Sequence, residues 1–498
     1  MTAGAPEGRF ARLIESHRTP THVAGVLLLA VGVLGALTLL VARGASSVWL
    51  AQAWTLAVVA LVGLAALTLP GDGQSRTERA VLVVTWAVAA LVLANTVVAW
   101  VDLDAWVWRA PSYFPFAQPI GTDFRGGAYQ AAQTFSTATS GWPPLPVVLF
   151  QPYLLLAPDT AYVAHLLVMI AMDLGAIGLA VLLGRSIVPQ ADGDTTERWR
   201  RAVGRLGPIL AVWLFVSFGF VLSVERGSID AFVAFFAMAG LASLVRRPHD
   251  VWTSTILFSL AANLKIYPAM LLLLVIWRFR WRSVLPIVAV NVLLALIAGP
   301  GNLMGFVRNS SSAIENGSSW VGNESAQSFS WWIDQVDPSY LPHVPTAVLL
   351  TVPAVVFVVT AALLWRRRDH VSTVLMACAT FPVMCLVPSV SHDYKTVILA
   401  APLVLLFAVL MGTMRTRSAE PWWMLLALAV AMFFIGRAPG HLIDYAPPLQ
   451  RFVWPALLMN KYLPILLLQV VIAWMAWRLP RPMGAAPGGD AAHVTERS

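Results

Sequence analysis

Long apolar stretches, separated by short turns that carry arginines, make up most of the chain. Each stretch has about the twenty residues that a helix needs to cross a bilayer, so we predict about twelve membrane-spanning helices. The runs are continuous rather than alternating, which is the pattern of helices and not of transmembrane strands. The predicted fold class is therefore all-α and polytopic. The predicted spans are 22–43, 47–69, 80–100, 158–184, 207–223, 229–245, 283–299, 343–365, 371–388, 396–414, 421–436 and 461–477.

Two further apolar segments are predicted to enter the membrane without crossing it. Residues 143–157 are short and begin with two prolines, so we place them in an external interfacial or re-entrant helix. Residues 251–277 have arginines near both ends and Pro268 inside, which favours a hairpin of two half-helices with Lys265 near its tip. The alternative is one tilted span, which would turn every later arginine cluster outward.

Composition supports this interpretation and gives it a direction. Of 498 residues, 58% are hydrophobic and 12% are charged, and the net charge is +8. The arginines collect in alternate turns, which predicts that these turns and both termini are cytoplasmic. The positive charge thus serves for anchoring, and no soluble domain offers a basic face to nucleic acid. Cys378 and Cys385 are predicted to be small buried residues rather than a disulfide or a metal site.

The predicted external segments are long, and their polar residues are the candidates for chemistry. In the first of them, 101–157, Asp123 lies between Pro/Gly breakers and an amphipathic stretch. A carboxylate there can deprotonate a hydroxyl nucleophile, or it can cap a helix. Asp102 and Asp104, at the start of the same segment, cap a span or act as the base, so the identity of the base stays open. The other external segments are 224–228, 300–342, 389–395 and 437–460.

Two of the shorter external turns carry charged residues. Glu225, Arg226 and Asp230 either form a local ion-pair cluster or act as a clamp in which Arg226 reaches a phosphate. His392 and Lys395 lie in a polar turn between two apolar spans, where together they can bind an anion. An ordinary polar turn is the alternative for this second pair.

Lysine is rare in this chain. Only three lysines occur among 33 basic residues: Lys265, Lys395 and Lys461. Because arginine serves for anchoring, we predict that Lys265 and Lys395 make specific contacts. Lys461 is predicted to snorkel at the start of the last span. Asp173 lies in the middle of a span and is predicted to make a structural hydrogen bond.

Short motifs follow one another along the chain: Asp123-Phe124 with Tyr129, Ala131 and Ala132; Pro143-Pro144; the polar turn Glu225 to Asp230; Leu264-Lys265 with Pro268; and the turn Ser391 to Lys395. In this order they resemble the GT-C superfamily of glycosyltransferases that use polyprenyl-phosphate sugars. Within it, the closest likeness is to glycosyltransferase family 87. The likeness covers roughly residues 80–415, and only the joint order of its motifs makes it specific.

The resemblance implies an inverting transfer outside the cytoplasm, from a polyprenyl monophosphate to a cell-envelope glycan or glycolipid. The sugar would be mannose or arabinofuranose, the location the plasma (inner) membrane, and no metal or other cofactor would take part. Asp123 would be the base. The donor phosphate would be bound by Arg226, Lys265, His392 and Lys395. Supporting roles would fall to Arg125, Tyr129, Glu225, Asp230, Tyr267, Asp393 and Tyr394.

A single transmembrane domain over 1–478 is predicted. It would hold a GT-C-like module at 80–300 and a variable module at 301–478. The remaining residues, 479–498, are rich in Pro, Gly and Ala and are predicted to form a disordered cytoplasmic tail.

Two other functions are alternatives at this point. A flippase or other transporter of lipid-linked oligosaccharides would spread polar residues through the middle of the membrane and show repeat symmetry. A polysaccharide polymerase or ligase also acts outside on lipid-linked glycans, through a large external loop.

Overall fold

The computed structural model describes residues 76–101, 121, 123–136, 143–187, 193–315, 346–386, 393–416, 422–437 and 461–479. These residues form helices joined by short turns, and they include no β-strand, so the all-α prediction is confirmed. The first two predicted spans, Asp102, Asp104, His392 and all of the predicted tail after residue 479 lie outside the described residues. The predicted number of spans is therefore not tested.

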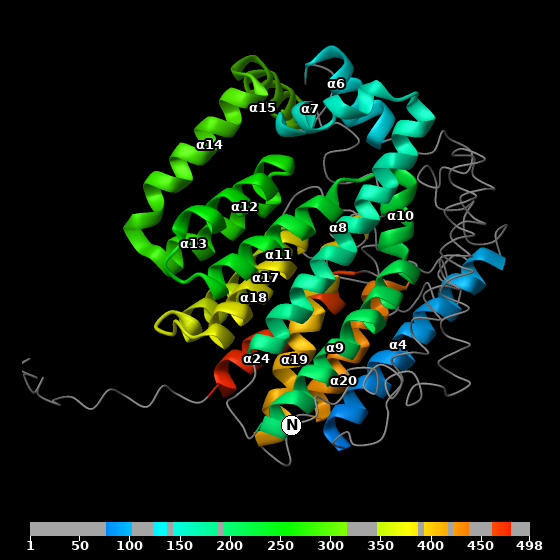
Figure 1. Cartoon of the computed structure of the whole chain (residues 1–498), viewed down its shortest axis with the longest axis vertical. Coiled ribbons are helices and arrows are strands. Elements are labelled where there is room, and N and C mark those ends of the chain that lie inside the picture. The colour runs from blue at the N-terminus through cyan, green and yellow to red at the C-terminus, as the bar shows by residue number, and fades with distance from the viewer. Residues whose placement is uncertain are drawn as a thin grey trace, which may run out of the picture.

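The order of the helices follows most of the predicted spans (Figure 1). In chain order they are α4 (Arg76–Val101), η2 (Phe124–Tyr129), α6 (Gln130–Thr134), α7 (Leu145–Leu149), η3 (Gln151–Leu155), α8 (Pro158–Ser186), α9 (Gly193–Val216), α10 (Phe218–Arg226), α11 (Asp230–Arg246), α12 (Val251–Leu264), η4 (Tyr267–Leu271), α13 (Leu272–Phe279), η5 (Arg280–Ser283), α14 (Val284–Ala298), α15 (Pro300–Glu315), α17 (Thr346–Leu364), α18 (His370–Leu386), η6 (Asp393–Leu399), α19 (Ala400–Thr416), α20 (Trp422–Gly436) and α24 (Tyr462–Arg478).

Apolar helices make this a membrane protein. Among the described residues, three helical stretches are long and apolar enough to cross a bilayer: Pro158–Ser186, Tyr267–Ala298 and Lys395–Gly412. Within the second stretch the backbone turns at Arg280 (φ 54°), so α13 and α14 are separate helices.

The predicted span 207–223 is broken, which corrects the sequence prediction. Helices α9 and α10 meet at Ser217 with a bend of 62°. Ser217 has an extended backbone, and its hydroxyl accepts a hydrogen bond from the Phe220 amide at 3.3 Å. The serine therefore caps α10 and starts a new helix within a continuous apolar run.

Both segments that were predicted not to cross consist of short helices. Residues 143–157 form α7 and η3, and the Gln151 amide ties them to α6 through the Ala132 carbonyl (2.9 Å). In the second segment α12 ends at Leu264, Lys265 is extended, and α13 packs back against α12. The predicted break at Lys265 is thus confirmed, and we call this pair the α12–α13 hairpin.

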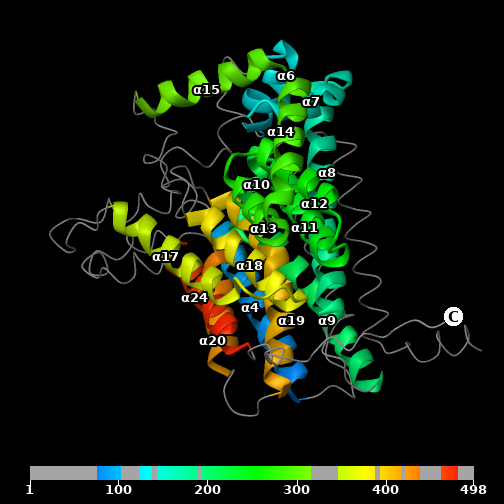
Figure 2. The same ribbon diagram turned by 90° about the vertical axis from the view of Figure 1, so that its left-hand side faces the viewer.

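Residues 300–342 were predicted to be an external polar loop, and this is wrong for 300–315. These residues form α15, which begins after Gly299 (φ 91°) ends α14. The Asn302 side chain holds the junction by donating to the Ala298 carbonyl at 2.8 Å. Helix α15 lies at the same end of the molecule as α6 and α7 and extends away from the bundle (Figure 2).

Two polar side chains inside the bundle differ from their predictions. Lys461 does not snorkel: it is 2% exposed and donates to the carbonyls of Phe434 and Ile435, so it caps α20. Asp173 is 2% exposed, and its Oδ2 accepts no hydrogen bond from the described residues. The structural hydrogen bond predicted for Asp173 is therefore absent there. Cys378 and Cys385 are buried and form no disulfide with the described residues, as predicted.

Candidate active site

The turn at 225–230, which joins α10 to α11, is the centre of the candidate site. Gly227 has φ 68°, and a Cβ at this position would lie 2.7 Å from the Phe124 Cβ, so the turn requires glycine. The Tyr162 hydroxyl donates to the Val224 carbonyl (2.5 Å), and the Gly121 amide donates to the Glu225 carbonyl (2.7 Å). The start of α8 and the segment around Asp123 are thereby fixed against this turn.

Aromatic packing positions Asp123 beside the turn. Asp123 immediately precedes η2, whose first residue, Phe124, is fully buried. The Phe124 ring lies 4.8 Å from His165, 5.5 Å from Phe150 and 5.7 Å from Tyr162 (ring centroids). Asp123 itself has helical backbone angles and makes no side-chain cap hydrogen bond, so the helix-cap alternative is wrong.

Asp123 and Arg226 form a partly buried ion pair. The guanidinium donates twice to Asp123 Oδ1, from Nε at 3.0 Å and from Nη2 at 2.7 Å. The Asp123 and Arg226 side chains are 14% and 20% exposed. Asp123 Oδ2 accepts no hydrogen bond from the described residues. One carboxylate oxygen is thus held by Arg226, and the other is placed to accept a proton from a hydroxyl.

Asp230, at the other end of the turn, has a different environment. It is fully buried, and its Oδ2 accepts from Lys265 Nζ at 2.9 Å and from the Ser228 hydroxyl. Its Oδ1 accepts from the Tyr267 hydroxyl. Both oxygens are therefore hydrogen-bonded, which a buried carboxylate requires. Asp230 fixes Lys265 and Tyr267 at the tip of the α12–α13 hairpin.

Lys395 joins the same group of side chains. It is 4% exposed, and its Nζ lies 4.7 Å from the centroid of the Tyr267 ring. Its helix, η6, packs against α10 and α11. Lys395 thus contacts Tyr267, which shares Asp230 with Lys265, although 130 residues separate the two lysines in the chain. The side chains of Asp393 and Tyr394 lie outside the description.

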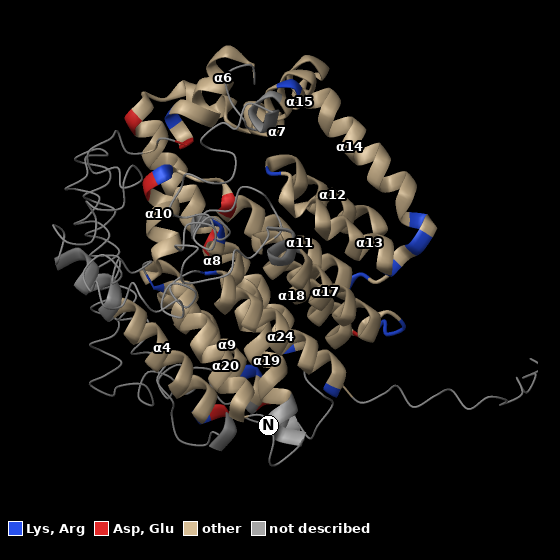
Figure 3. Ribbon diagram, turned by 180° about the vertical axis from the view of Figure 1, so that it is seen from behind, with Lys and Arg blue, Asp and Glu red and all other residues tan. Residues whose placement is uncertain are grey.

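Of the other residues predicted to support the site, two bind neighbouring structural groups and one makes no side-chain hydrogen bond with the described residues. Arg125 pairs with Asp159 at the start of α8 (2.5 Å), and the Tyr129 hydroxyl donates weakly to the Leu156 carbonyl (3.4 Å). Glu225 is 6% exposed, and its carboxylate accepts no hydrogen bond from the described residues. Acidic and basic segments lie side by side at the C-terminal end of α10 (Figure 3).

Three residues near the site were not identified from the sequence. Tyr162 and His165 lie one turn apart on α8, and His165 Nε2 lies 3.1 Å from the Gly227 carbonyl oxygen. Their spacing was the available signal, but it looks the same as core packing. Tyr153 is the third: burial raises the pKa of its hydroxyl to about 12. Its phenol therefore stays neutral and is unsuited to act as a base near neutral pH.

Comparison with known families identifies the family of the chain. The model of glycosyltransferase family 87 matches residues 142–389. The match includes the turn at 225–230 and the α12–α13 hairpin, whereas Asp123 and Lys395 lie outside it. A search of curated proteins and a search of solved structures each gave no match. The chain belongs to glycosyltransferase family 87 and is a membrane glycosyltransferase.

Proposed function

We propose that this enzyme transfers a sugar from a polyprenyl monophosphate to a hydroxyl of a cell-envelope glycan or glycolipid, with inversion, outside the cytoplasm. The observation that carries the proposal is the pair of groups at the two ends of one turn. A carboxylate with one open oxygen, Asp123, lies at one end. Two lysines, Lys265 and Lys395, are held around Tyr267 at the other.

The proposed reaction is a single displacement. The acceptor oxygen forms a bond to the anomeric carbon while the bond from that carbon to the phosphate oxygen breaks. The acceptor proton passes to Asp123 Oδ2, and the polyprenyl phosphate leaves with the bonding electrons. Attack from the face opposite the leaving group inverts the anomeric centre.

The lysines are assigned to the leaving phosphate. Negative charge grows on the phosphate oxygens as the bond breaks, and preorganised cations stabilise that charge. Lys265 is oriented by Asp230, and Lys395 lies over the Tyr267 ring. In this proposal the two lysines neutralise the charge of the phosphate, and His392 is predicted to assist them. No metal or other cofactor is required.

The role proposed for Arg226 changes with the structure. It was expected to bind the donor phosphate, but its Nε and Nη2 both donate to Asp123. We now assign Arg226 to positioning the base. The choice between mannose and arabinofuranose rests on the family resemblance.

A transfer assay tests the donor class. The purified protein would be placed in liposomes with an acceptor glycan and labelled polyprenyl-phosphate mannose, polyprenyl-phosphate arabinofuranose or the corresponding nucleotide sugars. We expect product from one lipid donor and none from a nucleotide sugar. The Lys395→Gln variant should raise the donor KM, while Arg247→Gln, an exposed arginine, should not. Product from a nucleotide sugar alone would overturn the proposal.

The proposed sidedness has its own test. Both native cysteines are buried, so background labelling by thiol reagents should be low. In intact cells, an impermeant thiol reagent should label a Gln130→Cys variant and spare an Arg282→Cys variant. Both positions are exposed in the structure. The reverse pattern would place the site on the cytoplasmic side.

A further inference from the structure

At the base of the α12–α13 hairpin, the end of α13 is hydrogen-bonded to the turn between α17 and α18. The Trp277 indole donates to the Trp365 carbonyl at 3.2 Å, and Arg278 Nη1 donates to the Arg368 carbonyl at 2.5 Å. Arg368 returns a hydrogen bond to the Trp277 carbonyl, and its guanidinium carbon lies 4.6 Å from the Trp277 ring centroid. We call the group of Arg278, Arg280 and Arg368 with these tryptophans the arginine clasp.

The clasp gathers positive charge without a described counter-ion. Burial and then the neighbouring Arg280 and Arg278 lower the pKa of Arg368 from its usual value, so these guanidinium groups are close enough to repel. Among the described residues, no carboxylate forms an ion pair with any of the three. Asp369, the nearest acid in the sequence, instead accepts from the Ser372 amide (2.9 Å) and hydroxyl (2.7 Å) and caps α18. Grouped guanidinium groups suit the oxygens of a phosphate.

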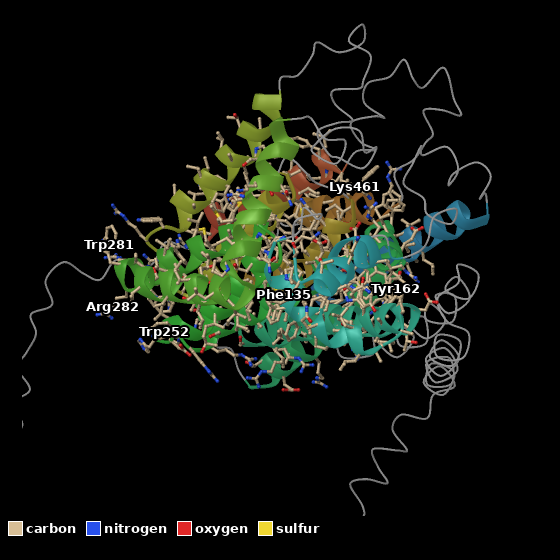
Figure 4. All side chains as sticks on the ribbon, turned by 90° about the horizontal axis from the view of Figure 1, so that it is seen from above. Phe135, Tyr162, Trp252, Trp281, Arg282 and Lys461 are labelled. Atoms are coloured by element: carbon tan, nitrogen blue, oxygen red, sulfur yellow. The ribbon has the colours of Figure 1, made fainter. Side chains whose placement is uncertain are left out.

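Two helices with exposed aliphatic side chains, α13 and α14, meet at the clasp. The exposed side chains of α13 and α14 are aliphatic, and they include Leu273, Ile276, Leu285, Val288, Val292 and Leu296. Trp281, which is 88% exposed, marks the end of this surface. It lies with Arg282 and Trp252 along one rim of the molecule (Figure 4). Tryptophan and arginine next to an aliphatic face are typical of the boundary between acyl chains and headgroups.

We propose that the arginine clasp binds one anionic phospholipid, with its phosphodiester at Arg278, Arg280 and Arg368 and its acyl chains along α13 and α14. This site is distinct from the candidate active site. Lys265 lies at the tip of the hairpin and the clasp at its base. The 14 residues of α12 separate them by about 21 Å at 1.5 Å per residue.

The turn between α11 and α12 offers a matched control. It also carries two exposed arginines, Arg246 and Arg247. Here a carboxylate is present, because Arg247 lies 3.9 Å from Asp250. Neutralising this pair removes the same charge as neutralising Arg278 and Arg280, but it leaves the clasp intact.

Native mass spectrometry of the detergent-purified protein can count bound lipids. The probes are dioleoyl phosphatidylglycerol, dioleoyl phosphatidylcholine and inorganic phosphate as a competitor. We expect one phosphatidylglycerol to bind in preference to phosphatidylcholine, without competition from millimolar phosphate. The R278Q/R280Q variant should weaken phosphatidylglycerol binding by roughly 25-fold, since each of the two arginines near an anionic headgroup contributes about fivefold. The R246Q/R247Q variant should bind as the wild type does.

Every other outcome overturns the proposal. Equal losses in both double variants would mean that general basic charge attracts the lipid. Equal binding of the two phospholipids, or displacement by inorganic phosphate, would mean that the clasp is not an anionic phospholipid site. If R278Q/R280Q does not fold, the binding of phosphatidylglycerol to the single variant Arg280→Gln tests the proposal instead. The Arg280 side chain makes no hydrogen bond with the described residues, so its loss should leave the fold unchanged while still weakening binding severalfold.

Discussion

The two carboxylates at the ends of the 225–230 turn have opposite environments. Asp123 is partly exposed. It accepts both hydrogen bonds from Arg226 on a single oxygen, which leaves its other oxygen open. Asp230 is fully buried, and both of its oxygens accept hydrogen bonds from Lys265, Tyr267 and Ser228. An open carboxylate can take a proton, whereas a saturated one can only position its partners.

This difference assigns the two carboxylates different roles: Asp123 accepts the proton, and Asp230 positions other side chains. Charge burial is costly, so Asp230 tolerates its environment only with all its partners in place. Asp123 depends less on Arg226 for stability, because its side chain keeps some contact with solvent whereas Asp230 has none. Changes at the Asp230 end should therefore lower stability as well as catalysis, and changes at the Asp123 end should lower mainly the rate.

The largest effect on stability is expected from Lys265→Gln. It leaves Asp230 as a buried charge without its cation, which costs about 3–5 kcal/mol. Thermal unfolding in detergent should show a strongly lowered midpoint. The double variant Lys265→Met with Asp230→Leu should recover part of the loss, since it removes both charges. An unchanged midpoint in Lys265→Gln would show that the pair is not buried as described.

A smaller loss is expected from Gly227→Ala, which disturbs both ends of the turn. The left-handed backbone at φ 68° costs an alanine about 1–2 kcal/mol, and its Cβ would press on Phe124. Both unfolding temperature and transfer rate should fall. Gly126→Ala is the control, because a Cβ there has nothing within 4 Å. Equal behaviour of the two variants would count against a required left-handed turn.

Some of this arrangement could be predicted from the sequence. Pro268 and the flanking arginines located the hairpin tip at Lys265, and the shared external assignment of Asp123 and Arg226 correctly put them on the same side of the bundle. The pairing of Asp123 with Arg226 could not be foreseen, because 103 residues separate them. Nor could the packing of Lys395 against Tyr267.

The errors have local physical causes. The average hydropathy of a segment does not reveal that Ser217 caps a helix and so divides an apolar run into α9 and α10. Nor does it predict the capping role of Lys461, because that role depends on carbonyls at the end of another helix. In each case hydrogen bonds between one side chain and the backbone decide the structure, and the side chain's neighbours in sequence do not show them.

A pH effect of about 1 kcal/mol is expected away from the site, at Asp250. This carboxylate caps α12 by accepting from the Thr253 hydroxyl (2.6 Å) and amide (3.0 Å). Those hydrogen bonds lower the pKa of Asp250 below its usual value. Its contribution is therefore complete above the unfolded pKa and is lost as pH falls through the folded pKa. Asp250→Ala should be less stable by about 1 kcal/mol at pH 7.

The unfolding midpoints of Asp250→Ala and the wild type, measured from pH 7 downward, check this. The two curves should converge in acid. A constant gap at every pH would assign the loss to something other than the carboxylate.

A smaller loss of stability than for Lys265→Gln is expected from Arg226→Gln. The Asp123 side chain keeps 14% exposure whereas Asp230 is fully buried, so losing the Arg226 hydrogen bonds should cost about 1.5–3 kcal/mol. The transfer rate should nevertheless fall, because Asp123 loses the group that orients it, and Arg226→Lys should recover part of the rate. A large drop in the unfolding midpoint with an unchanged rate would reverse the roles assigned to the two ends of the turn.

The most direct measurement is the rate of sugar transfer by Asp123→Asn, from the lipid donor that the wild type uses. The asparagine keeps the size of the side chain and removes the proton acceptor. We expect kcat to fall by about 10²–10⁴-fold, with the donor KM and the unfolding midpoint nearly unchanged. Equal rates for Asp123→Asn and the wild type would remove Asp123 as the base and contradict the division between the open and the saturated carboxylate.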